Sequence, residues 1–70
     1  MGIAEMKMTV LNVIRNLKSP FTMDFLFYYL NHHYLIQNHS VVKSVINSMI
    51  DGKQLEYYND PVSGWGFRNI

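Results

Sequence analysis

The three histidines are the side chains best suited to metal binding or acid–base chemistry, and their spacing favours neither. His32 and His33 are adjacent, so on a helix their rings point about 100° apart and do not converge on one metal ion. Four residues further on stand Ile36 and Gln37, which offer no His or acidic partner, and His39 is isolated in the sequence. The simpler interpretation is that all three supply polarity at a surface or a helix end.

Other catalytic and cofactor motifs are missing from the chain. It has no cysteine, which excludes disulfides, thiolate zinc sites and cysteine nucleophiles. It also has no Gly-rich phosphate loop, no nucleophile elbow and no pattern of paired carboxylates. Seventy residues leave little room for a substrate cleft. We therefore expect no enzyme, no metal site and no cofactor.

A row of hydrogen-bonding side chains recurs at positions i, i+3, i+4 and i+7 within residues 39–51. The row consists of Ser40, Lys43, Ser44 and Asn47. On a helix these side chains share one face, which is polar, short-chained and carries a single cation. Such a face can contact a polar partner, but it is also typical of an ordinary solvated helix, and both interpretations stay open.

The composition indicates one small globular domain spanning residues 1–70. Hydrophobic residues form 49% of the chain and charged residues 16%, which is too apolar for a disordered tail. Six basic and five acidic residues leave a net charge of +1, so bulk electrostatics indicates no class of partner. No apolar run is long enough to span a membrane and no secretory signal is present. We expect a cytoplasmic protein.

Two helices are predicted ahead of the polar row. The first covers residues 3–17, with an apolar stripe at spacings of three and four that comprises Ile3, Met6, Val10, Ile14 and Leu17. The second covers residues 23–34 and begins after Thr22, a good N-cap residue. Because the stretch from Phe25 to Leu30 is apolar or aromatic on every side, we expect some of its aromatic rings to be exposed.

The third predicted helix covers residues 39–51 and carries the polar row. Its opposite face is an apolar stripe of Val42, Val45, Ile46 and Met49. Asn38 and Ser40 are competent N-caps. Gly52 is expected at the C′ position, where a left-handed residue commonly ends a helix.

After Gly52 the apolar residues alternate, which predicts two strands over residues 54–58 and 65–69. Residues 59–64 between them form a turn cluster. The alternation predicts that four strand side chains face the helices: Leu55, Tyr57, Trp65 and Phe67. Trp65 and Phe67 could instead stack on the bases of a single strand, but core packing fits their alternation better.

The pattern across the third helix and the first strand matches a known family. Val42, Ile46, Met49 and Gly52 follow an apolar-x-x-x-apolar-x-x-apolar-x-x-Gly pattern, and an apolar-Glu-Tyr strand comes next as Leu55-Glu56-Tyr57. The start of the second helix, Pro20-Phe21-Thr22 followed by Leu26, fits the same family. The chain thus resembles the winged helix-turn-helix domains of small bacterial, phage and plasmid transcriptional regulators. Gly52 is followed by one residue more than is commonest there.

The resemblance implies an α+β fold in which three helices precede a two-stranded β-hairpin wing. The alternative is a helical bundle with an irregular tail. The Gly52 stop and the turn between two aromatic strands argue against that alternative.

The resemblance also implies a DNA-binding transcriptional regulator whose third helix lies in the major groove. Base and phosphate contacts would then come from the polar row, and His39 would lie near a phosphate at the start of the helix. Lys53 and Arg68 would add phosphate contacts from the base of the wing. Because the net charge is so low, double-stranded DNA binding would require a homodimer.

A protein–protein interaction module, such as an inhibitor or adaptor with little or no DNA binding, is the alternative function. The aromatic second helix and the near-neutral charge favour it. Phe27 and Tyr28 are the candidate face for either a dimer or a protein partner. Substitution of Lys43 and Asn47 would separate the two functions, since only DNA binding depends on them.

Overall fold

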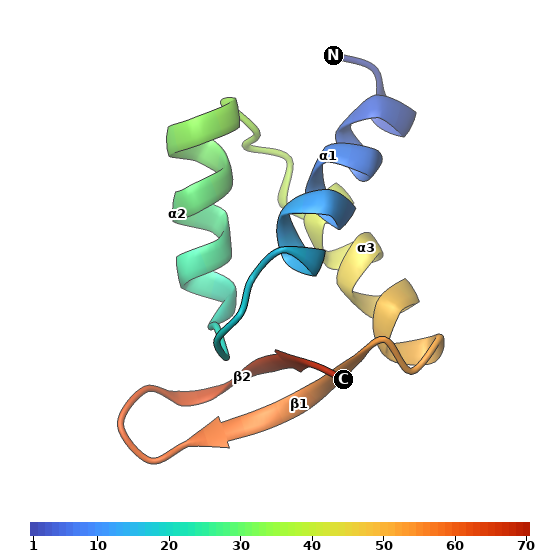
Figure 1. The fold of residues 1–70 in the computed structure, drawn as a ribbon. Helices are drawn as coiled ribbons and strands as arrows, with labels where there is room; N and C mark the ends of the chain where they lie inside the picture. The colour runs from blue at the N-terminus through green and yellow to red at the C-terminus, as the bar shows by residue number, and fades with distance from the viewer.

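The computed structural model describes residues 1–70 as three helices followed by an antiparallel hairpin (Figure 1). The elements are α1 (Ile3–Arg15), α2 (Met23–Tyr34), α3 (His39–Asp51), β1 (Leu55–Asp60) and β2 (Gly64–Asn69). This confirms the predicted α+β class and is consistent with a winged-helix arrangement. None of the helices is long and apolar enough to cross a membrane.

Helix α1 ends two residues before the predicted boundary. The side-chain amide of Asn16 donates to the carbonyl of Asn12 at 2.7 Å, and the Leu17 amide donates to the carbonyl of Ile14. The last turn is therefore tightened, as helix ends often are. Helices α2 and α3 have the predicted bounds, and the hairpin strands are longer toward the turn than predicted.

The core lies where α1, α2 and α3 meet the near end of the hairpin. Its largest fully buried side chains come from all of these elements: Val10, Ile14, Leu26, Leu30, Val42, Ile46 and Leu55. The predicted stripe of α3 is buried. The stripe of α1 was predicted less well, since Ile3 is exposed and Val13 is buried instead. Ile3 stands in the first turn of α1, next to the chain end.

The hairpin is attached to the helices through the segment between α1 and α2. Phe21 and Phe67 exchange two backbone hydrogen bonds of 2.9 and 2.7 Å, which adds one residue pair on the free edge of β2. Their rings lie 5.7 Å apart. A Cβ at Gly66 would overlap the carbonyl oxygen of Phe21 and lie 3.0 Å from its carbonyl carbon. The close approach of the two backbones therefore requires glycine at position 66.

The N-cap residues of α2 and α3 are the predicted ones. The C-terminal end of α3 differs from the prediction. Thr22 accepts from the Phe25 amide at 3.1 Å and Asn38 accepts from the Val41 amide at 3.2 Å. Gly52, however, has φ −82°, and the left-handed residue is Lys53 at φ 58°.

The reason for that difference is the hydrogen-bond pattern of the turn. The amides of Lys53 and Gln54 donate to the carbonyls of Ile50 and Met49, as in a Schellman motif whose C′ residue is Lys53. The predicted C′ glycine is thus one residue too early. Gly52 is instead the C-cap, at φ −82° and ψ 4°, and the chain reverses at Lys53.

Two of the four strand side chains predicted to face the helices are exposed. Leu55 and Phe67 are buried, whereas Tyr57 and Trp65 are 63% and 70% exposed. Trp65 pairs with Asn59, one step from the turn. The turn end of the hairpin projects beyond the helices (Figure 1), and the Trp65 side chain near this end is exposed. Alternation correctly grouped these residues but could not show how far the helices extend.

Candidate nucleic-acid interface

The polar row of α3 is exposed along its whole length. Ser40, Lys43, Ser44 and Asn47 all lie on the surface, opposite the buried stripe. The same helical period continues to Asp51, which is also exposed. We refer to these five residues as the α3 face. Sequence reasoning omitted Asp51, although extending the spacing by one turn would have found it.

His39 is held by a neighbouring aromatic ring. Its imidazole stacks on Phe27 with centroids 3.8 Å apart and planes within 6°. Phe27 is half-buried against the core, whereas Tyr28 is 66% exposed and stacks on His32. His39, Phe27 and Tyr28 together line a shallow depression between α2 and the start of α3. The structure therefore brings the predicted partner face next to one end of the α3 face.

The cation of the hairpin is paired within the hairpin itself. Arg68 and Glu56 are directly opposite each other on the two strands, and the Arg68 Nε donates to Glu56 Oε2 at 2.8 Å. The Arg68 guanidinium also lies 4.7 Å from the centroid of the Tyr58 ring. Arg68 is exposed, as a phosphate contact must be, but its charge is already balanced.

The tip of the hairpin is negative. Asp60 Oδ1 accepts from the amides of Ser63 and Val62 at 3.0 and 2.8 Å. These backbone hydrogen bonds, that from Ser63 first, lower the pKa of Asp60 below its ordinary value of 3.8. The carboxylate therefore stays ionised and fixes the turn.

Three of the five cations that have no carboxylate partner gather on another side of α3. A groove of about 290 Å³ runs between α1 and α3, where the two helices lie side by side (Figure 1). A second depression shares the lining residues Arg15, Met49 and Gln54 with it. Lys7 and Arg15 line the first part, and Arg15 and Lys53 the second. We call the two depressions together the basic groove.

Of the predicted site residues, Lys53 and Ser44 belong to the basic groove. Lys7 and Arg15 fall outside the predicted apolar stripe of α1 and are not among the predicted site residues. Nothing in the order of residues relates α1 to α3, so only the packing of the two helices shows that these cations flank the α3 face.

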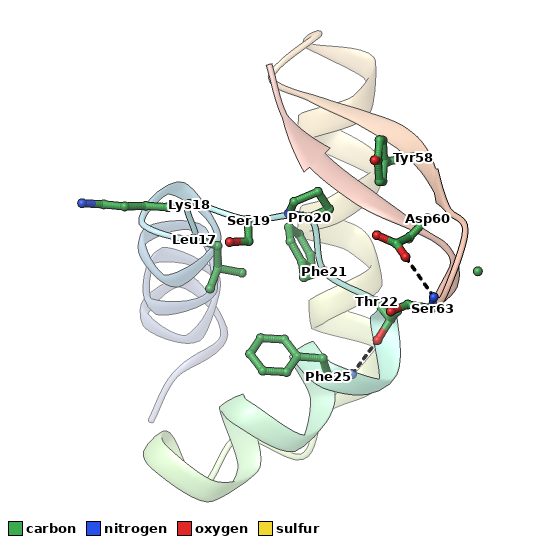
Figure 2. A pocket seen from close by; sticks show the side chains of 12 residues that line it. Leu17, Lys18, Ser19, Pro20, Phe21, Thr22, Phe25, Tyr58, Asp60 and Ser63 are labelled. Atoms are coloured by element: carbon green, nitrogen blue, oxygen red, sulfur yellow. Dashed lines mark hydrogen bonds between the residues drawn. The ribbon is translucent and has the colours of Figure 1, made fainter.

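The largest depression lies elsewhere and includes none of the predicted site residues. It measures about 440 Å³ and separates the segment between α1 and α2 from the hairpin (Figure 2). Phe25 and Tyr58 contribute aromatic walls, and the Asp60 carboxylate is occupied by its turn. The amine of Lys18 points away from the depression (Figure 2). No acid–base pair or charged cluster faces this space.

No three His, Asp or Glu side chains come close enough to hold a metal ion. The rings of His32 and His33 lie edge to face at 5.0 Å. The α3 face and the basic groove beside it are therefore the candidate binding surfaces.

No protein-family model, curated protein or solved structure matches the chain.

Proposed function

We propose that this domain binds double-stranded DNA and acts as a small transcriptional regulator, with the α3 face in the major groove. The observation that carries the proposal is the exposed row of Ser40, Lys43, Ser44 and Asn47 on a helix directly followed by a hairpin. These residues occupy the first three turns of α3. The N-terminal part of a recognition helix is the part that reaches base edges in winged and related helix-turn-helix proteins.

The side chains of the row suit base recognition. An α-helix with its side chains is about as wide as the major groove of B-DNA. The amide of Asn47 can pair with both N6 and N7 of adenine, and Lys43 can donate to guanine or to a phosphate. Ser40 and Ser44 can act as donor or acceptor. Asp51, at the far end of the face, repels phosphates and confines close contact to the first three turns.

The low charge sets a condition on this function. Phosphate neutralisation supplies most of the affinity of DNA-binding proteins, and one copy of this chain carries a net charge of only +1. A homodimer doubles the number of cations at the duplex and reads two half-sites. We therefore propose that the regulator binds as a dimer, with Phe27 and Tyr28 as the candidate contact between the copies.

The test combines sedimentation with duplex titration. A random duplex of about 30 base pairs, long enough for two half-sites, is titrated with the protein at low and at physiological salt, and a preferred site is then selected from a duplex library. We expect binding that weakens steeply as salt rises. Asn47→Ala should relax the preference at one base pair by about 1–3 kcal/mol. Thr9→Ala, on α1, is the control. A dimer that ignores duplex at low salt would contradict the proposal.

The exposed aromatic residues of α2 favour a second candidate, a protein-binding module. Phe25, Tyr28 and Tyr34 are all exposed on this helix, and such a patch is typical of protein interfaces. Under this alternative, Lys43→Ala and Asn47→Ala leave function intact while Tyr28→Ala abolishes it. If Tyr28→Ala instead converts a dimer into monomers and weakens duplex binding, the α2 face serves the DNA-binding function.

A further inference from the structure

We propose that the phosphate backbone of bound DNA lies in the basic groove between α1 and α3, rather than against the hairpin. The inference rests on the proposed function and extends it. The α3 face has one cation, Lys43, and one anion, Asp51, so it can read bases but supplies no net attraction for phosphates. Another surface must provide that attraction.

The basic groove has the required charge. Lys7, Arg15 and Lys53 are exposed, none forms an ion pair, and no Asp or Glu lines either part of the groove. Lys7 and Arg15 are eight residues apart on α1, which corresponds to about 12 Å along the helix axis. A strand of nucleic-acid backbone lying along α1 would therefore meet two cations in succession, and Lys53 would continue the row at the end of α3.

The groove also has the required position. Ser44 belongs both to the α3 face and to the lining of the groove, so the two surfaces are continuous. A helix seated in the major groove has a sugar–phosphate backbone along each flank. The flank of α3 that is turned toward α1 ends at Ser44 and Ser48, and the cations of α1 stand beyond these hydroxyl groups.

The hairpin is a poor alternative for the same task. Arg68, its only cation, is paired with Glu56 and covered on one face by Tyr58. While Glu56 balances its charge, Arg68 adds no net positive charge that would attract a phosphate to the hairpin. At the tip, the ionised Asp60 repels phosphates.

The experiment measures how duplex affinity depends on salt for the full chain. Affinity for a selected duplex is recorded between about 50 and 200 mM KCl for the wild type and for Lys7→Ala, Arg15→Ala and Lys53→Ala. Lys18→Ala removes the same charge elsewhere and is the matched control, and Arg68→Ala tests the hairpin as the alternative phosphate site. All five side chains are exposed, so thermal unfolding should show each variant to be folded.

We expect each groove variant to reduce the slope of log affinity against log salt by about 0.9, the value for one phosphate contact. Lys18→Ala should leave it unchanged, and so should Arg68→Ala if the hairpin does not contact phosphate. If the wild type binds duplex and the groove variants keep its slope, or if Arg68→Ala reduces the slope as much as they do, this inference is overturned while the proposed function stands. If the wild type does not bind duplex at low salt, both are overturned.

Discussion

The basic groove and the hairpin each contain three charged side chains, yet they present opposite electrostatic surfaces. In the groove, Lys7, Arg15 and Lys53 form no ion pair, and no Asp or Glu lines either depression. In the hairpin, Glu56 balances Arg68 and an ionised Asp60 occupies the tip. The number of basic residues in a region therefore does not give the net positive charge that its surface presents to a partner.

The two regions differ because of how helices and strands place side chains. Residues opposite each other in an antiparallel pair lie close together on one face of the sheet, so the register brings Glu56 to Arg68. Where two helices pack, the residues beside the contact line from both helices point outward along a common edge. Between α1 and α3 these residues are basic, hydroxyl-bearing or apolar, and none is acidic.

The largest effect on stability should come from Gly66→Ala, because this substitution detaches the hairpin from the segment between α1 and α2. The added methyl overlaps the Phe21 carbonyl, so the Phe21–Phe67 hydrogen bonds must break or the strands must shift. We expect a loss of about 3 kcal/mol in the free energy of unfolding, measured by urea denaturation. Gly2→Ala is the control, since a Cβ there meets nothing within 4 Å. An unchanged denaturation midpoint for Gly66→Ala would show that the hairpin is not held by this backbone contact.

Lys53 lies between α3 and β1, where the basic groove meets the hairpin. Substitutions of Lys53 can separate an effect on the stability of the fold from an effect of its charge on DNA binding. A left-handed conformation costs a lysine roughly 1 kcal/mol relative to glycine, so Lys53→Gly should stabilise the fold by about 0.5 kcal/mol after the greater chain entropy of glycine in the unfolded state is counted. Lys53→Ala removes the same charge but keeps the strained Cβ. Both variants should weaken duplex binding equally, and only Lys53→Gly should raise the melting temperature. Equal melting temperatures would argue against strain at this position.

The smallest effect should be the response of the hairpin tip to acid. The pKa of Asp60 is lower in the folded chain than its ordinary value of 3.8, so its contribution to stability is present at neutral pH and is lost as the pH falls below that value through the folded-state pKa. Amide resonances of Val62 and Ser63, followed by NMR, should shift in this range. Asp60→Asn keeps an acceptor oxygen and should abolish the shift. A titration midpoint at or above the ordinary pKa would contradict the role assigned to this carboxylate.

Much of the fold could be predicted from the sequence because the relevant signals are local. The N-caps Thr22 and Asn38, the stripe of α3 and the turn before Gly64 each depend on neighbours within a few residues. The polar row was also correctly placed on an exposed face. The exposure of Trp65 was predicted wrongly, since it depends on where the helices end beside the hairpin rather than on the strand's own pattern.

By itself, the sequence determined the order and type of the elements and which side chains share a face, since helical and strand periodicity follow from backbone geometry alone. Only the tertiary structure decided which charges are free. Pairing of Arg68 with Glu56 follows from strand register, and the alignment of Lys7 and Arg15 beside α3 follows from helix packing. Both bring together residues from separate elements of the fold, and no local pattern in the chain encodes that proximity.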